Sequence, residues 1–300
     1  MLLDCIIIGG GPAGLNAALV LGRARRKVIL FDEGKPRNAV TRESHGFITR
    51  DGTAPSEFRR LAHQDIRKYP SVEYRTERIT EAARHTGFLE VTTAQGAVYH
   101  TKKLILATGL KEVLPDIPGI HDYYGQSLFS CPYCDGWELR DQPLAVISED
   151  VPRLLHLTQI LWNWSRDLII CTNGASVLTG EHKEILRRKH IRCHEQRIVS
   201  LAGHNGRLSR VLFSGGEEAA VSGGFISPET FQASDLAKSL GCMMNPAGGL
   251  RTDEFGRTGI PGIYAAGDTA VIAPSQVIIA AGEGSRAAIG VNTDLAHEEF

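Results

Sequence analysis

Two cysteines lie three positions apart near the middle of the chain, in the stretch S-C-P-Y-C-D-G-W-E at residues 130–138. Cys131 and Cys134 could ligate a metal, form a structural disulfide or work as a redox pair, and Asp135 follows directly. In a C-x-x-C sequence one thiol typically has a lowered pKa and is a thiolate near neutral pH. Asp135 could also cap the N-terminus of a helix.

A zinc site would need a second pair of Cys or His ligands at suitable spacing. The chain has six cysteines, and the four outside the pair form no second C-x-x-C; they are Cys5, Cys171, Cys193 and Cys242. We therefore expect no metal site. The four isolated cysteines are expected to be inert, with Cys5 behaving as a small apolar residue inside a strand.

The composition is that of a globular protein with no strong charge bias. The chain has 300 residues, 42% of them hydrophobic, and its 33 basic and 34 acidic residues give a net charge of −1. This length favours two domains, and the charge gives no pull toward nucleic acid or an anionic membrane. No apolar run approaches the ~18–20 residues of a membrane span. The N-terminus lacks the basic region of a signal peptide, so we expect a cytoplasmic protein, in which a C-x-x-C is typically metal-binding or catalytic.

The first thirty-odd residues predict a strand, a glycine-rich turn, a helix and a second strand. Leu3–Ile8 is a continuous apolar run, as in a buried parallel strand. G-G-G-P-A-G follows at 9–14, then a helical stretch, then the apolar run within 27–33 that ends in acids. Asp32 is placed to bind a ribose hydroxyl, with Glu33 as the nearby alternative.

This context indicates a dinucleotide-binding turn. Gly9 permits the tight turn, Gly11 lets a pyrophosphate approach the backbone, and Gly14 lets helix and strand pack closely. The start of the helix supplies N–H donors and the positive end of its dipole.

The remaining segments predict a mixture of strands and helices. The expected elements are a helix near 54–69, strands at Phe88–Thr93, Ala97–His100 and Lys103–Thr108, and a small-residue helix at 276–291. Two short motifs punctuate them, A-T-G at 107–109 and Y-A-A-G-D at 264–268.

Taken together, G-G-G-P-A-G, A-T-G and Y-A-A-G-D resemble, in that order, the flavoprotein disulfide reductases with two dinucleotide-binding domains. C-P-Y-C-D-G between the last two motifs narrows the resemblance to the low-molecular-weight, thioredoxin-reductase-like branch. The resemblance covers essentially the whole chain. It implies an α/β fold with two Rossmann-like dinucleotide-binding domains and a homodimer. The FAD domain is expected to be discontinuous, at 1–114 and 247–300, with an inserted domain at 115–246 that carries the cysteine pair.

The same resemblance implies roles for individual residues. Cys134 is expected to face the flavin of FAD, Cys131 to exchange with an external thiol pair, and Asp135 to shuttle protons. The residues expected to bind FAD come from both parts of the discontinuous domain; they are Gly9, Gly11, Gly14, Asp32, Thr108, Gly109, Gly267, Asp268, Gln276 and Val277.

One stretch departs from the family pattern where a second nucleotide should bind. NADPH-dependent relatives carry a glycine-rich phosphate loop after the strand expected here at 142–147, but this chain continues S-E-D-V-P-R-L at 148–154. No glycine allows close approach, and Glu149 and Asp150 place negative charge where a pyrophosphate would lie. Pro152 suits a first helical turn, so we still expect a helix.

A second departure follows the next expected strand, at 167–172. NADPH-dependent relatives have an arginine-bearing segment there for the 2′-phosphate, whereas this chain has Asn173 and Gly174. We expect a Rossmann-like domain that does not bind NADPH. The alternative is an NADPH-dependent thioredoxin reductase with an atypical nucleotide loop.

H-G-F-I-T-R-D-G at 45–52 and C-P-Y-C-D-G-W-E look most like the dithiol oxidases of the gliotoxin and holomycin type, which pass electrons from flavin to dioxygen. Their motif often has His where this chain has Asp135. A second nucleotide-free branch accepts electrons from ferredoxin or a flavoprotein such as flavodoxin. The expected substrate is a thioredoxin-like protein or a small-molecule dithiol, with the direction of electron flow left open. A rival interpretation is a non-catalytic flavin redox sensor.

Three further residues have two interpretations each. His45 could serve as a base near the flavin or the thiols, or could make a structural hydrogen bond in a loop. Trp162 and Trp164 could belong to the core, which we favour, or could line a groove over the unused nucleotide position.

Overall fold

The computed structural model describes residues 1–175 and 178–300, and its contacts divide them into two compact units. The first unit comprises residues 1–39, 46–111 and 230–300, and the second comprises residues 40–45 and 112–229. Each unit is built around its own largely parallel sheet, so the predicted α/β fold with two Rossmann-like sheets is confirmed. Residues 230–246, which are expected from the sequence to lie in the inserted domain, make their contacts in the first unit.

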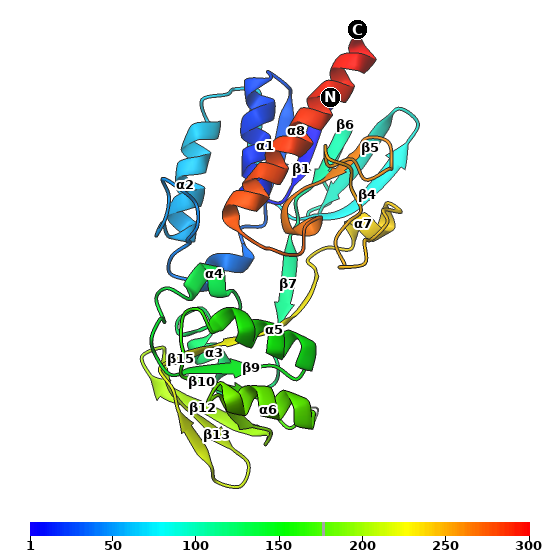
Figure 1. Ribbon diagram of the computed structural model, residues 1–300. Coiled ribbons are helices and arrows are strands. Elements are labelled where there is room, and N and C mark those ends of the chain that lie inside the picture. Colours follow the sequence, from blue (N-terminus) through cyan, green and yellow to red (C-terminus); the bar gives the residue numbers. More distant parts are fainter. Residues whose placement is uncertain (176–177) are drawn as a thin grey trace. The chain divides into compact units, whose positions relative to one another are not determined.

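The first unit contains a seven-stranded sheet in the order β3-β2-β1-β6-β5-β4, with β17 also paired to β6 (Figure 1). Its strands are β1 (Leu2–Ile8), β2 (Val28–Phe31), β3 (Val72–Arg75), β4 (Ile79–His85), β5 (Phe88–Thr93), β6 (Val98–Leu106) and β17 (Ile263–Ala265). Its helices are α1 (Pro12–Arg23), η1 (Arg37–Val40), α2 (Pro55–Ile66), α7 (Leu236–Ser239), η2 (Gly267–Thr269) and α8 (Val277–Glu299). The strands β7 (Leu110–Val113) and β16 (Glu229–Gln232) form a separate two-stranded pair.

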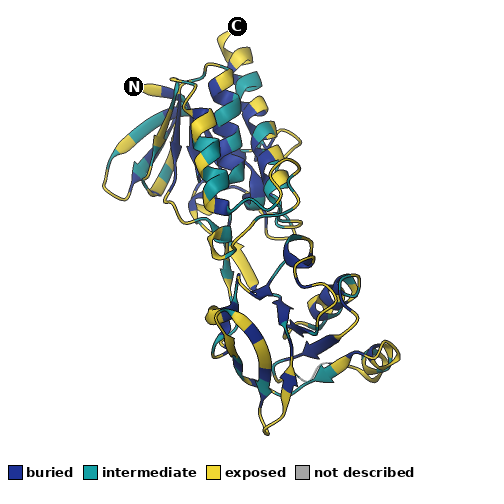
Figure 2. Ribbon diagram, turned by 90° about the vertical axis from the view of Figure 1, so that its left-hand side faces the viewer, coloured by how far each residue is buried: buried dark blue, intermediate teal, exposed yellow. Residues whose placement is uncertain are grey.

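Alternate side chains of the central strands bury on opposite faces of this sheet. Cys5 and Ile7 pack with α1 and α8, while Ile6 and Ile8 pack with α7 and the β4–β5 hairpin. The small residues of α8 let it lie directly against α1, because a Cβ on Gly284 would come within 2.0 Å of the Ala13 carbonyl oxygen. The two helices run side by side in Figure 1, and the buried residues of α8 face the core in Figure 2.

The second unit contains a five-stranded parallel sheet in the order β11-β10-β9-β15-β8 and a three-stranded antiparallel sheet, β12-β13-β14. Its strands are β8 (Leu128–Phe129), β9 (Leu144–Ile147), β10 (Leu168–Cys171), β11 (Arg192–His194), β12 (Ile198–His204), β13 (Arg207–Phe213), β14 (Glu218–Ala220) and β15 (Gly223–Ile226). Its helices are α3 (Ile120–Tyr123), α4 (Pro132–Asp135), α5 (Val151–Leu161) and α6 (Gly180–Arg188). One face of the parallel sheet packs on α5 and α6, and the other packs on α3 and the antiparallel sheet.

Two sequence predictions need adjustment. The strands expected at Ala97–His100 and Lys103–Thr108 form one strand, β6, because its first half pairs with β5 and its second half with β17. The final helix runs beyond 291 to Glu299. No helix among the described residues is both long enough and apolar enough to cross a membrane.

Candidate functional site

The glycine-rich turn after β1 leaves the start of α1 open. Gly9 adopts φ +110°, a conformation that favours glycine, and a Cβ on Gly14 would lie 1.8 Å from the Gly9 carbonyl oxygen. Gly11 precedes the first turn of α1, where no side chain caps the helix, and a Cβ added there would have no atom within 4 Å. Uncapped N–H groups beside open space fit a pyrophosphate.

Asp32 lies at the end of β2 in a buried position, 8% exposed. Its carboxylate is paired with Arg59 of α2 and accepts a hydrogen bond from the Tyr74 hydroxyl at 3.1 Å. A Cβ on Gly10 would lie 2.5 Å from this carboxyl group, so the second glycine of G-G-G is needed for close approach. The pattern that predicts a ribose-binding role for Asp32 gives no signal for Arg59 and Tyr74, which lie 27 and 42 residues away from it and share no motif with it.

The A-T-G and A-A-G-D motifs meet beside the carboxyl ends of β6 and β17. The buried Thr269 hydroxyl accepts a hydrogen bond from the Gly109 N–H at 2.7 Å and lies 3.4 Å from the Thr108 hydroxyl. Asp268 is paired with Arg37 at 2.9 Å. The structure therefore brings together Thr108, Gly109, Gly267 and Asp268, and adds Thr269, which directly follows the motif.

Gln232 of β16 adds a polar group that no sequence motif indicates. Its amide nitrogen donates to the carbonyl oxygens of Gly248 and Thr269 at 3.0 and 3.1 Å. Its Oε1 is buried and has no hydrogen-bond partner among the described residues. A buried acceptor of this kind normally has a donor, and a cofactor carrying N–H and O–H groups at this edge of the sheet could supply one.

Gln276 and Val277, the remaining residues expected to bind FAD, begin α8. Gln276 precedes the first turn, its side chain makes no cap bond there, and both residues are half-buried. The open turn at Gly11 and the unpartnered Gln232 oxygen are thus the observations that fit a bound dinucleotide in the first unit.

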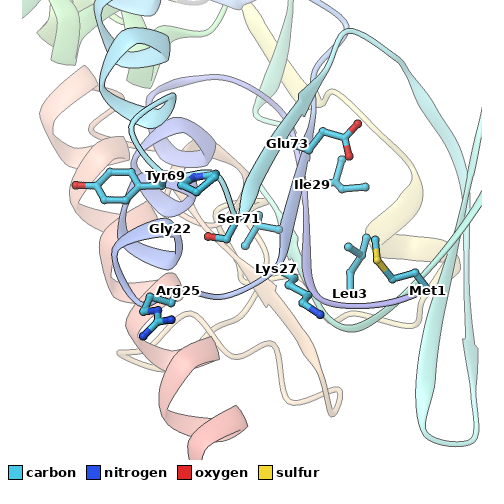
Figure 3. A pocket seen from close by; sticks show the side chains of 11 residues that line it. Met1, Leu3, Gly22, Arg25, Lys27, Ile29, Tyr69, Ser71 and Glu73 are labelled. Carbon is cyan, nitrogen blue, oxygen red and sulfur yellow. The ribbon is translucent and has the colours of Figure 1, made fainter.

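A cavity of about 530 Å³ lies at the opposite end of the same sheet, where its parallel strands begin (Figure 3). Leu3, Lys27, Val28 and Ser71 line it, around the starts of β1, β2 and β3. Ligands of parallel α/β sheets bind at the carboxyl ends of the strands, and none of the residues expected to bind FAD lines this cavity. It is therefore separate from the candidate site.

The cysteine pair forms a disulfide at the start of α4 in the second unit, with the two Cα atoms 5.3 Å apart. Cys131 precedes the helix and Pro132 occupies its first turn, so the backbone N–H groups of Cys134 and Asp135 both donate to the Cys131 carbonyl. Both cysteines are half-buried. The disulfide is therefore held at a helix start and keeps part of its surface accessible to a thiol.

Asp135 is the last residue of α4, so the alternative that it caps a helix N-terminus is wrong. The reason is that the helix begins one residue after Cys131 and lasts a single turn. Asp135 is buried, with 9% of the residue exposed. Burial first and the nearby Glu138 carboxylate second raise its pKa to about 7, and His45 opposes the rise.

The raised pKa of Asp135 predicts that the fold is less stable when this carboxyl group is ionised. An acid whose pKa is higher in the folded state stabilises the fold below its unfolded value of 3.8, and this contribution is lost as pH rises through about 7. Asp135→Asn is neutral at every pH, so we expect it to raise the free energy of unfolding at pH 8 by up to about 4 kcal/mol. Denaturant unfolding at pH 8 and at pH 3.5 checks this; an equal difference at both values would contradict it.

Side chains of the loop after β9 form hydrogen bonds at the start of α5 and with the loop after β10. Asp150 caps α5 by accepting a hydrogen bond from the Arg153 N–H at 2.9 Å. Glu149 accepts a bond at 2.7 Å from the Asn173 amide, whose oxygen accepts one from the Ile198 N–H at 2.9 Å. The helix expected after Pro152 is present, and both acids of S-E-D take part in hydrogen bonds within the protein.

The four remaining cysteines are free thiols. Cys5 and Cys171 are fully buried, and burial raises the pKa of both thiols far above neutral pH. Burial also raises the pKa of Cys193 and Cys242. Thiols of this kind are unreactive at neutral pH. The described residues contain no group of three or more His, Cys, Asp or Glu that could hold a metal ion.

Both tryptophans are half-buried, and Trp162 packs against a hydrophobic core cluster of the second unit. Trp164 packs edge-on against Tyr133 of α4, with ring centroids 5.5 Å apart. Trp162 lies beneath the Arg166 guanidinium, 4.6 Å from its ring centroid. Trp164 therefore supports the turn that carries the disulfide.

Comparison with known proteins identifies the family. The model of the pyridine nucleotide-disulphide oxidoreductases matches residues 3–148 and 170–284. The chain belongs to this family. It is 31% identical to thioredoxin reductase aclD of Aspergillus oryzae, over 99% of this chain and 98% of the relative.

Two solved structures resemble this family member over nearly their whole length. The "Putative Thioredoxin Reductase TrxB from Bacillus anthracis" is 46% identical, with a TM-score of 0.96 over 99% of this chain and all of that one. HlmI is 33% identical, with a TM-score of 0.93 over 99% of this chain and 94% of that one. The protein is a flavoprotein disulfide oxidoreductase of the thioredoxin-reductase type, with FAD as its cofactor and the C-x-x-C pair Cys131–Cys134.

Proposed function

We propose that this enzyme transfers electrons from a dithiol substrate through Cys131 and Cys134 to FAD, and does so without NADPH. The observation that carries the proposal is the contrast between the starts of its two Rossmann-type helices. At α1, Gly11 faces open space and no side chain caps the helix. At α5, the carboxylate of Asp150 already accepts a hydrogen bond from the backbone N–H of Arg153, in the first turn of the helix.

The contrast matters because a pyrophosphate binds through free N–H groups and the positive end of the helix dipole. At α5 a carboxylate of the protein already neutralises that end, and Glu149 adds a second negative charge next to it. A bound phosphate would have to displace the cap and lie beside like charge. Asn173, which stands where NADPH-dependent relatives have an arginine-bearing segment, is itself held between Glu149 and Ile198.

The proposed chemistry balances as two thiol–disulfide exchanges. One substrate thiolate attacks Cys131, forming a mixed disulfide and breaking the Cys131–Cys134 bond, so that Cys134 leaves as a thiolate. The second substrate thiolate then attacks the substrate sulfur of the mixed disulfide. This closes the substrate disulfide and releases Cys131 as a thiolate. The substrate has lost two electrons and two protons, and the protein pair has gained the electrons.

Asp135 is the group proposed to accept a proton in these steps. With its pKa near 7 it can exist in either protonation state around neutral pH, which suits a general base. When bound, FAD supplies the two-electron acceptor for the reduced cysteines, with dioxygen as the terminal acceptor that leaves as hydrogen peroxide.

The cofactor would be held by residues of the first unit. Gly9, Gly11 and Gly14 would shape the pyrophosphate turn, and Asp32, fixed by Arg59 and Tyr74, would accept a ribose hydroxyl. The remaining FAD contacts proposed are Thr108, Gly109, Gly267, Asp268, Gln276 and Val277. A homodimer is also proposed, on the family resemblance.

The substrate class implied by the family is a thioredoxin-like protein dithiol, and a small-molecule dithiol is the alternative. A second function, NADPH-dependent reduction of such a disulfide, is favoured by the thioredoxin reductase names of the relatives and by the 46% identity to TrxB. The two functions run the cysteine pair in opposite directions.

Oxygen uptake distinguishes the two directions. We expect the purified yellow protein to consume oxygen with dithiothreitol alone, forming one hydrogen peroxide per dithiol, and we expect NADPH to change this rate by less than about twofold because α5 rejects the nucleotide. The matched control is Cys193→Ser, which removes a half-buried cysteine outside the pair and should leave the rate unchanged. A turnover that begins only when NADPH is added would overturn the proposal.

A further inference from the structure

A short segment of chain is packed against the disulfide unit, although the residues on both sides of it belong to the other unit. Residues 40–45 make their contacts in the second unit, between stretches 1–39 and 46–111 of the first. The Arg42 guanidinium donates to the Gln126 side chain at 3.1 Å, and a Cβ on Gly125 would lie 2.3 Å from the Val40 carbonyl oxygen. The segment is thereby fixed on the unit that carries the cysteines.

His45, at the end of this segment, lies among acids. Its Nε2 is 3.7 Å from a carboxylate oxygen of Glu138 and 3.6 Å from one of Glu43. The His45 side chain is 18% exposed, whereas those of Glu138 and Glu43 are 42% and 58% exposed. His45 is therefore the more enclosed partner of two ion pairs that form when its ring is protonated.

The same two residues, His45 and Glu138, are the charged groups that act on Asp135. Glu138 disfavours the ionised form of Asp135 and is the larger of the two influences, while His45 favours the ionised form. His45 in turn faces Glu43 and Glu138. Asp135, His45 and Glu138 thus form one coupled cluster beside the disulfide, and Glu43 lies at its outer edge.

We propose that His45 is a positioning residue that, held between Glu138 and Glu43, offsets the effect of Glu138 and keeps Asp135 available as a proton acceptor for the thiols. Because it acts on the thiol chemistry through Asp135, this inference rests on the proposed function. It also explains the packing of residues 40–45 on the unit that carries the cysteines, because this packing keeps His45 next to Glu138.

Infrared titration of the purified holoprotein measures this cluster directly. The carbonyl band of the protonated Asp135 carboxyl is identified by its loss in Asp135→Asn, and its midpoint is followed with pH. We expect His45→Asn to move the midpoint upward and Glu138→Gln to move it downward, each by roughly 0.5–1 pH unit. His45→Lys, which keeps a positive charge, should leave the midpoint at or below the wild-type value.

The matched control is His156→Asn, an exposed histidine on α5 with no part in the cluster, which should leave the midpoint unchanged. Opposite shifts for His45→Asn and Glu138→Gln support the proposal, because a merely structural role would not change sign with the charge removed. Unchanged midpoints in both variants would overturn it. Glu138 is exposed, so Glu138→Gln decides the matter even if His45→Asn fails to fold.

The acid limb of the dithiol-oxidation rate is measured on the same variants. Limbs that move with the infrared midpoints support both the cluster and the role of Asp135. If the infrared midpoints move while the acid limbs of the rate stay fixed, the electrostatic coupling is upheld but the positioning role of His45 is contradicted. Infrared shifts in a protein that oxidises no dithiol would refute the proposed function and uphold the coupled cluster.

Discussion

Cys134→Ser is expected to lower the rate of flavin reduction by a dithiol by roughly a thousandfold or more, because it removes the reacting thiol. The substrate could still attack Cys131 only if a disulfide were present, and with serine at 134 none forms. Anaerobic mixing with dithiothreitol, followed through the flavin absorbance, measures the effect. The change is small, from sulfur to oxygen at a half-buried position, so the fold should persist.

The companion variant separates the two cysteines. Cys131→Ser also removes the disulfide, but it leaves the thiol that is expected to face the flavin. We therefore expect Cys131→Ser to show an altered flavin spectrum at a pH where Cys134 is a thiolate, and Cys134→Ser to show none. If Cys134→Ser were reduced by dithiols at the wild-type rate, or if the altered spectrum appeared in that variant instead, the assignment of the two thiols would be wrong.

The second large effect is expected from two glycines of the same turn. Gly14→Ala places a Cβ 1.8 Å from the Gly9 carbonyl oxygen, so the strand and helix must separate. We expect it to lower the free energy of unfolding by about 3 kcal/mol or more, with loss of flavin. Gly11→Ala places its Cβ in space that the protein leaves open, at a φ of −75° that any residue adopts. It should cost the fold less than about 1 kcal/mol.

The pair distinguishes a folding role from a cofactor role. Gly11→Ala should purify folded but with little flavin, and added FAD should raise its melting temperature far less than that of the wild type. Thermal unfolding with and without FAD, together with the flavin content of the purified protein, measures both. Full flavin content in Gly11→Ala would place the pyrophosphate elsewhere, and an unperturbed fold in Gly14→Ala would contradict the packing of α1 on β1.

Much of the fold could be predicted because its signals are local. The apolar run of β1, the glycines that follow it and the acid after β2 lie within 32 residues and impose one geometry. Pro152 likewise predicted a first helical turn, which α5 has. The bounds of short elements could not be predicted in this way. The single turn of α4 begins at Pro132, so Asp135 ends this helix and does not cap its N-terminus.

The contacts that complete the site could not be predicted, because they join residues far apart in the sequence. Arg59 and Tyr74 reach Asp32 from α2 and β3, and no spacing rule connects them. His45 was singled out for its residue type, but only the packing of residues 40–45 on the second unit places it beside Glu138. Glu149 and Asp150 were recognised as charges that oppose a phosphate, yet their hydrogen bonds within the protein required the structure.

One paired measurement on the oxidised protein decides whether the flavin takes its electrons from a dithiol or from NADPH. The oxidised protein is mixed anaerobically, in separate shots, with equal excesses of NADPH and of dithiothreitol while the flavin absorbance is recorded. We predict rapid loss of the flavin band with the dithiol, its return on admission of air, and no comparable loss with NADPH. Rapid loss of the band with NADPH would refute the proposed function, because the closed start of α5 would then bind the nucleotide that we propose it excludes.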